Sequence, residues 1–163
     1  MAKKTAYYGI VLGLAMICGY IEMILPLSIG IPGAKLGLAN IVALYIIYKN
    51  GYVPALAINI SRIVLTTLLF GNVMTFLYSL VGGTLAVTVM FLISKIKCFS
   101  PVGSSIAGAV FHNLGQIVVA MFVIGSSAVL YLVPMLTLVA VITGLLIGIA
   151  TSYLLKKVRL MRL

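Results

Sequence analysis

Residues 31–45 read IPGAKLGLANIVALY: a Pro-Gly break opens an apolar run that carries Lys35 and Asn40. Polar side chains at membrane depth are costly, so they usually face a cavity and have a function there. Interrupted hydrophobic segments also mark binding sites in many transporters. We therefore predict that Lys35 and Asn40 belong to a ligand-binding site.

The composition around this stretch is that of a membrane protein. Of the 163 residues, 64% are hydrophobic and 7% are charged, whereas a soluble domain carries about 25% charged residues. A soluble fold of this size cannot bury so much apolar surface. We predict an all-α integral membrane protein with a single domain over residues 1–163.

The charge balance is one-sided, because eleven Lys and Arg residues stand against one acid, Glu22. Most of the bases lie in short clusters between apolar runs, where they set topology and contact anionic lipid head groups. Nucleic-acid binding is therefore not expected, despite a net charge of +10. Cys18 and Cys98 lack metal-type spacing, and we interpret both as reduced, buried thiols.

Six apolar segments approach the length of about 20 residues that a helix needs to cross the hydrocarbon core. Turn-type stretches separate them, and their expected bounds are Tyr7–Leu25, Leu36–Tyr48, Val53–Phe70, Val73–Ser94, Val102–Ile124 and Ala128–Leu155. The second segment is short for a span. An alternative is that Ser28–Lys35 dips into the membrane as a loop, which irregular backbone does only under cover of protein or a watery cavity.

The basic residues predict the orientation. They cluster at alternate ends of the segments: Lys3, Lys4, Lys49, Lys95, Lys97, Lys156, Lys157, Arg159 and Arg162. By the positive-inside rule these ends are cytoplasmic, so we expect six transmembrane helices with both termini cytoplasmic. A secretory signal at the N-terminus is the alternative, but its cleavage would leave five segments and invert the charge pattern.

The third segment places a charge inside the membrane. Asn59, Arg62 and Thr66 are spaced by three and four residues, which puts them on one helical stripe. Arg62 lies near the middle of the segment, where a charge needs a partner. One interpretation is a structural ion pair between Glu22 and Arg62. The other is that Arg62 contacts an anionic ligand and Glu22 has a different task.

The fifth segment carries His112, Asn113 and Gln116. His112 and Gln116 are i and i+4, so they share a helical face with Gly108 and Gly115. A lone membrane histidine often only hydrogen-bonds to a neighbouring helix, but the amides beside this one favour a cavity lining. No metal or haem site is expected, since the chain has one His and one acid.

Small residues recur at the spacing that lets helices approach closely. The pairs are Gly9 with Gly13, Ala15 with Gly19, and Gly144 with Gly148. Most such pairs serve packing inside a bundle. The alternative for the first segment is that a helix of a partner protein docks there.

Two motifs point to a known family: IPGAKLGLAN at Ile31–Asn40 and FHNLGQ at Phe111–Gln116. Over essentially its whole length the chain resembles the family described as heptaprenyl diphosphate synthase component I, also called Gx transporter family proteins. That family is similar to the substrate-binding S components of energy-coupling factor (ECF) vitamin transporters. The resemblance implies an S-component-like bundle that binds a small molecule from outside, under its first extracellular loop.

The resemblance also implies partners. In S components a small-residue motif on the first helix docks on the coupling subunit, and Gly9, Gly13, Ala15 and Gly19 would have that role here. ATPases would be supplied in trans, because the chain has no P-loop. Some family members resemble instead the membrane component of flavin-based extracellular electron transfer, a quinone-interacting anchor beside an extracellular FMN-binding protein.

The enzyme name of the family is not expected to describe this chain. Prenyl synthases hold magnesium with aspartate-rich motifs, which neutralises the leaving diphosphate. This chain has no Asp and a single Glu. We therefore expect no catalytic residue, while binding of a prenyl diphosphate stays open.

Together these features predict a multi-pass protein of the bacterial cytoplasmic membrane that binds a small anionic or amphipathic molecule from the extracellular side. Lys35 and Arg62 would neutralise its negative charge. The side chains expected to orient it by hydrogen bonds are Asn40, Asn59, His112, Asn113 and Gln116. The candidate ligands are a quinone, a prenyl diphosphate or a flavin-like molecule, with no covalently bound cofactor.

Overall fold

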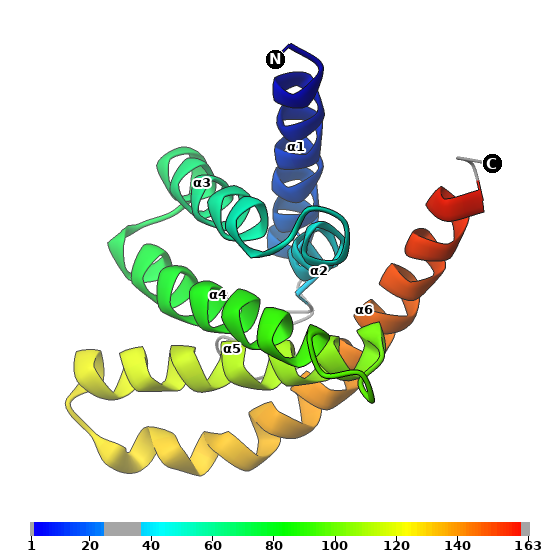
Figure 1. The fold of residues 1–163 in the computed structure, drawn as a ribbon. Coiled ribbons are helices and arrows are strands. Elements are labelled where there is room, and N and C mark those ends of the chain that lie inside the picture. Colours follow the sequence, from blue (N-terminus) through cyan, green and yellow to red (C-terminus); the bar gives the residue numbers. More distant parts are fainter. Residues whose placement is uncertain (1, 25–36, 161–163) are drawn as a thin grey trace.

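The structure, a computed structural model, describes residues 2–24 and 37–160. Every regular element within these ranges is helical, as the composition predicts. Along the chain the elements are α1 (Ala2–Ile24), α2 (Ala39–Asn50), α3 (Tyr52–Phe70), α4 (Val73–Ser94), α5 (Pro101–Ile124), the 3-10 helix η1 (Ser127–Leu132) and α6 (Val133–Leu160) (Figure 1).

Five helices are long and apolar enough to cross a membrane: α1, α3, α4, α5 and α6, the last together with η1. The chain is therefore a multi-pass helical membrane protein. The 12 residues of α2, at about 1.5 Å each, fall short of the ~30 Å hydrocarbon core. Six α-helices are present in the described ranges, but only five are long enough to span, so the prediction of six full spans is not confirmed.

The short helix α2 lies at the centre of the bundle. It contacts every other α-helix of the described chain, and its Leu44 and Ile46 are fully buried. Helices α3, α4, α5 and α6 pack in chain order as an arc around it (Figure 1). Helix α1 is peripheral, since among the described elements it packs only against α2 and α3.

The turns use residues that suit helix ends. The Asn72 side chain accepts a hydrogen bond from the Thr75 backbone N–H at 2.8 Å and caps α4. Ser100 caps α5, with Pro101 in its first turn, and Gly125 ends α5 in a left-handed conformation. These residue types are preferred at such positions, which is why the bounds of α3, α4 and α5 match the prediction to within one residue.

Other boundaries differ from the prediction. Helix α1 starts five residues earlier than expected and includes the basic pair at the N-terminus. Helix α2 starts only at Ala39, because Gly37 has a φ of 73°, which an α-helix cannot include. The last segment begins as η1 and becomes α6 at Val133, directly before Pro134. Proline lacks the N–H needed inside a helix but is tolerated in a first turn.

Glycines bring α4, α5 and α6 into close contact. A Cβ on Gly115 of α5 would lie 2.9 Å from the Cα of Gly82 on α4. A Cβ on Gly148 of α6 would lie 2.6 Å from the Cα of Val102 on α5, and Gly144 is equally constrained by the α5 backbone. The Gly144–Gly148 pair therefore serves packing within the bundle, the commoner role of this spacing.

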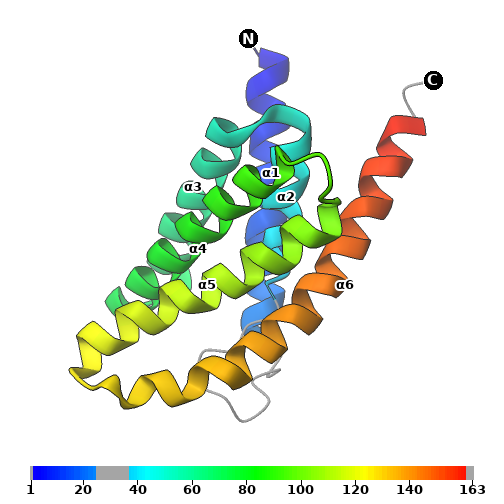
Figure 2. The same ribbon diagram turned by 60° about the horizontal axis from the view of Figure 1, so that its bottom comes forward.

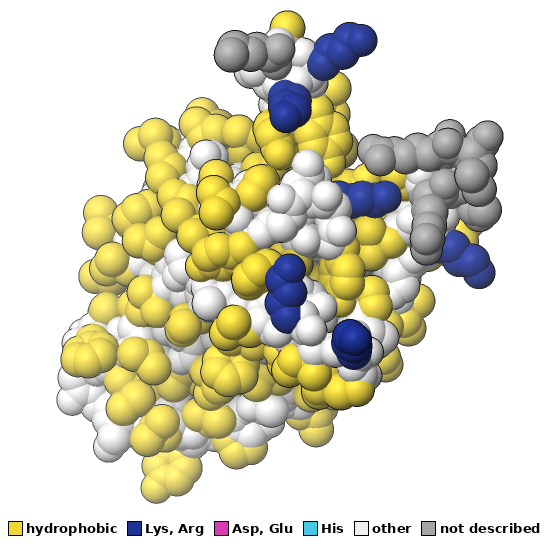
Figure 3. Space-filling view, in the orientation of Figure 1, with side chains coloured by type: hydrophobic (Ala, Val, Ile, Leu, Met, Phe, Trp, Pro, Cys, Tyr) yellow, Lys and Arg dark blue, Asp and Glu magenta, His cyan; other side chains and the backbone are white. Residues whose placement is uncertain are grey.

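The basic side chains gather toward one end of the bundle. Lys49 lies in the last turn of α2, and Lys95 and Lys97 lie in the turn after α4. The start of α1 and the end of α6 lie on the same side of the molecule (Figures 1 and 2). Figure 3 shows the Lys and Arg side chains of that side on an otherwise mostly apolar surface. The common side agrees with the predicted topology, and its cytoplasmic placement stays a prediction.

The two cysteines are free thiols, but neither is fully buried, contrary to the expectation. Cys98 is exposed, because it lies in the turn between α4 and α5, outside the packed helices. Cys18 on α1 is half-buried.

Candidate polar pocket at the end of the bundle

A polar pocket lies at the end of the bundle away from the basic turns. Its volume is about 130 Å³, and it is enclosed by the last turns of α1 and α3, the start of α2, the first two turns of α4 and one residue of α5. The described lining consists of Gly19, Glu22, Gly37, Ala39, Asn40, Arg62, Ile63, Thr66, Thr67, Phe70, Gly71, Thr75, Ser79 and His112.

Arg62 supplies the positive charge of this pocket. Its Nη2 donates a hydrogen bond of 3.0 Å to Oδ1 of Asn59, one turn earlier on α3. Across the helix interface, the position that a Cβ on Gly19 would take lies 3.6 Å from Arg62 Nη1. The guanidinium is thus oriented by Asn59 and lies against α1 at Gly19, where an added Cβ would make an ordinary van der Waals contact with it.

Glu22 lines the same pocket and holds the start of α2. Its Oε1 accepts a hydrogen bond from the backbone N–H of Gly37. The carboxylate is also near enough to Arg62 for the two charges to interact. The structure therefore brings together the two residues that the sequence suggested as a pair, at the wall of one cavity.

Hydroxyl groups line the side of the pocket formed by α3 and α4. The Thr66 hydroxyl donates to the Arg62 carbonyl, and that of Thr75 donates to Asn72 at 3.0 Å. Within the described part of the chain the hydroxyls of Thr67 and Ser79 make no hydrogen bond, so they can contact a ligand. Two donors with free lone pairs beside a guanidinium suit an anionic or polar group.

Sequence reasoning did not select Thr67, Thr75, Ser79 or Phe70 for the site. A signal was present in the short Gly71-Asn72 turn between two long apolar segments. Such a turn makes neighbouring helices antiparallel, so hydroxyl residues in the last turn of one and the first turns of the next come together.

Of the seven residues predicted to bind a ligand, some line the pocket and others do not. Asn40, Arg62 and His112 line the pocket. Asn59 is 3% exposed and lies behind Arg62, outside the lining. Lys35 lies outside the described residues.

The other two predicted residues on α5 are also outside the lining. The Nδ2 of Asn113 donates a hydrogen bond of 2.9 Å to the carbonyl of Leu136, which ties α5 to α6. The Gln116 side chain packs against Gly82 of α4. Both arrangements are helix-to-helix contacts. The prediction missed this because residues spaced by i and i+4 share a helical face whether that face lines a cavity or packs against another helix.

The four predicted docking residues of α1 do not share one surface. A Cβ on Gly9 or Gly13 would meet nothing within 4 Å, so both lie on an open face. Ala15 is 2% exposed and belongs to the hydrophobic core. Gly19 faces the pocket and Arg62. Only the first two are placed where a partner helix can reach them.

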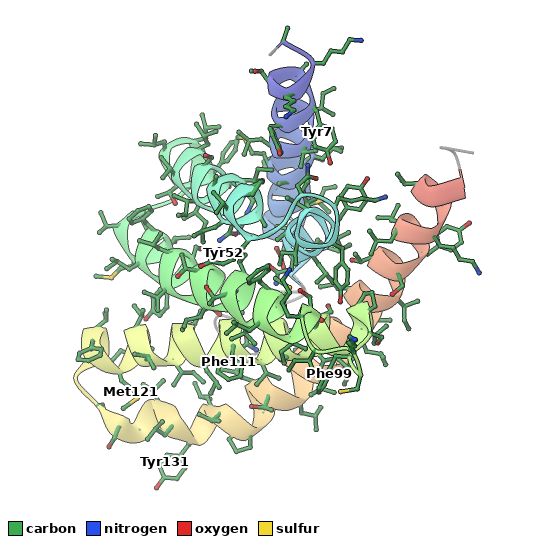
Figure 4. The ribbon with its side chains drawn as sticks, viewed as in Figure 1. Tyr7, Tyr52, Phe99, Phe111, Met121 and Tyr131 are labelled. Atoms are coloured by element: carbon green, nitrogen blue, oxygen red, sulfur yellow. The ribbon has the colours of Figure 1, made fainter. Side chains whose placement is uncertain are left out.

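No three His, Cys, Asp or Glu side chains gather as a metal site would need, within residues 2–24 and 37–160. The side chains of η1 also stay outside the pocket. Tyr131, for example, points away from the bundle (Figure 4). The chemistry available at the site is therefore that of one guanidinium, one carboxylate, one imidazole, one amide and several hydroxyls.

The fold and the pocket define a multi-pass helical membrane protein with a small polar cavity at one end of its bundle. The sequence model of the family described as heptaprenyl diphosphate synthase component I matches residues 11–154, so the chain belongs to that family. No curated protein and no solved structure shows significant similarity to the chain.

Proposed function

We propose that this protein is a membrane binding protein that takes the anionic or polar part of a small molecule into the pocket around Arg62. The observation that carries the proposal is the guanidinium itself: a charge held inside a membrane helix is costly and usually functional. Here Asn59 orients it toward a cavity whose other walls carry hydroxyls. A purely structural arginine does not need such a cavity.

The role that fits this site is that of an S-component-like subunit of an ECF-type transporter. Binding rather than catalysis is proposed, because the chain has one carboxylate and prenyl transfer needs several to hold magnesium. Transport would require a coupling subunit and ATPases in trans. The open face of α1 at Gly9 and Gly13 supports such docking, because nothing in the described chain covers it.

Native mass spectrometry of the protein, purified gently from its own membranes, tests the proposal. We expect a retained small molecule of defined mass in the wild type and in Lys97→Gln, a control that removes a base outside the pocket. Arg62→Gln should lose that molecule while its thermal transition, followed by circular dichroism, stays cooperative. Equal retention in folded Arg62→Gln would remove the pocket from the function.

The same spectra address the partners. Co-purification of ATPases would support transport. Recovery of an extracellular FMN-binding protein, with a quinone as the bound molecule, would instead favour the electron-transfer anchor. Whichever molecule is retained, the proposed site requires that Arg62→Gln reduces its retention.

A further inference from the structure

The pocket is too small to enclose a whole ligand. Its volume of about 130 Å³ is well below the roughly 300–1,000 Å³ of typical small-molecule pockets. Its polar lining suits a charged group of a few atoms. The rest of any larger molecule must therefore lie outside the cavity. The residues that line its exit from the cavity indicate whether that part is polar or apolar.

Two aromatic rings form the wall between α1 and α3. The centroids of Tyr20 on α1 and Phe70 on α3 are 5.2 Å apart with the ring planes tilted by 40°. Phe70 lines the cavity, yet 50% of Phe70 and 42% of Tyr20 are exposed on the outer surface of the bundle. The ring pair thus lies between the polar cavity and the exposed surface of α1 and α3.

This wall is thin. Gly19, the neighbour of Tyr20, leaves the Arg62 guanidinium directly behind the backbone of α1. Among the described α-helices, α1 also has the fewest neighbours, since it packs only against α2 and α3. On α1, the residue that contacts the Arg62 guanidinium (Gly19) is therefore directly followed by an exposed one (Tyr20).

The ring pair lies near the ends of two helices that are long and apolar enough to cross a membrane. Phe70 is the last residue of α3, and Tyr20 lies one turn before the end of α1. Aromatic residues near such ends commonly act as interfacial anchors. This pair differs from an ordinary anchor, because it joins two helices and one of its rings also lines a charged cavity.

We infer that the pocket holds the anionic head group of a single-chain amphiphile, which enters sideways from the bilayer between α1 and α3 and leaves its tail in the lipid beside Tyr20 and Phe70. The inference rests on the proposed function and adds the ligand class and its route. A tail in lipid needs no apolar cavity, since lipid is as apolar as a protein interior.

Photolabelling tests this route. The protein in zwitterionic-lipid nanodiscs is illuminated with dodecyl phosphate or dodecanoic acid that carries a diazirine in the middle of the tail, and labelled peptides are identified by mass spectrometry. We expect saturable labelling on α1 and α3 near Tyr20 and Phe70, with one of the two head groups. Arg62→Gln should lose it and Lys97→Gln should keep it.

Labelling spread evenly over the lipid-facing helices and unaffected by Arg62→Gln would mean annular lipid, and would overturn the inference. Arg62-dependent labelling at another helix pair would overturn the route. If inorganic phosphate or acetate competes as well as the unlabelled amphiphile, the ligand is a soluble anion. In these last two cases the inference fails while the proposed function stands.

The rings themselves give an independent readout. Tyr20→Ala combined with Phe70→Ala should speed the exchange of bound probe by about threefold to tenfold, the factor that an aromatic pair supplies. The matched control is Phe122→Ala, an aromatic side chain that is 85% exposed on α5 and outside the pocket. Unchanged exchange in the double variant would show that the wall is not the gate.

Discussion

Gly83 of α4 leaves the space that the Asn59 side chain of α3 occupies. A Cβ on Gly83 would lie 2.9 Å from Asn59 Nδ2 and 3.4 Å from its Oδ1. That same Oδ1 accepts the hydrogen bond from Arg62. A glycine outside the pocket therefore sets the position of the charge inside it, through one buried amide.

Gly83→Ala should consequently displace Asn59 and disturb Arg62. Overpacking of this kind costs about 1–3 kcal/mol of stability, so we expect a lower thermal transition and weaker retention of the pocket ligand. Gly9→Ala is the control, because its added methyl meets open space and should change stability by less than about 1 kcal/mol. Both effects are measured on detergent-purified protein, by circular dichroism and native mass spectrometry. Equal transitions in the two variants would contradict the packing argument.

Glu22→Gln should strengthen the binding of an anion at the pocket. Glutamine has the same shape and its Oε1 can still accept the hydrogen bond from Gly37 N–H, but the negative charge beside Arg62 is removed. Loss of about 1.4 kcal/mol of repulsion corresponds to a tenfold lower dissociation constant. Titration of the amphiphile into nanodiscs measures it. A weaker affinity in Glu22→Gln would indicate that the pocket selects a zwitterion.

Asn113→Ala should affect stability but not ligand binding. The change removes the side-chain donor that ties the Leu136 carbonyl to α5. That carbonyl keeps its helical N–H partner within α6, so the cost is that of one lost hydrogen bond, about 0.5–1.5 kcal/mol. Thermal unfolding should therefore shift downward, while the mass and occupancy of the retained ligand stay those of the wild type. Loss of ligand from an otherwise stable Asn113→Ala protein would return this residue to the binding site.

Gly148→Ala should loosen α6 from α5. The added methyl group would meet the Val102 backbone at 2.6 Å, and a backbone cannot move aside as a flexible side chain can. We expect a destabilisation of about 1–3 kcal/mol and increased proteolysis of α6. Gly13→Ala, on the open face of α1, is the neutral control. Resistance of α6 equal to that of the control would show that the helices tolerate a wider separation.

Gly13→Leu separates docking from packing on α1. A large side chain at this open position should leave the thermal transition of the isolated protein unchanged. It should also abolish association with a coupling subunit, if transport is the function. Co-purification from membranes measures that association, and normal recovery of the subunit with Gly13→Leu would exclude docking at this face.

Much of the architecture was predictable because it depends on local composition. Long apolar runs separated by Gly, Pro and Asn turns gave accurate bounds for α3, α4 and α5. The prediction failed where one residue's backbone conformation mattered, as at Gly37, and where a proline moved the start of a helix, as at Pro134. Neither effect changes the hydropathy of a segment.

The candidate site was predictable only for residues whose chemistry is conspicuous in a membrane helix. Arg62, Asn40, His112 and Glu22 stand out against an apolar background, and all of them line the pocket. Asn113 is equally conspicuous but hydrogen-bonds to a neighbouring helix. Helical periodicity places a residue on a face without stating what that face meets.

The sequence by itself determined the membrane class, the order of the helices and the presence of a costly charge in the third one, because these follow from composition and length. Only the tertiary structure decided that α2 is the centre of the bundle. It also decided that Gly19 faces Arg62 and that Asn59 acts from behind the pocket. Such pairings depend on how helices cross, and crossings are set by side-chain volumes on two segments at once.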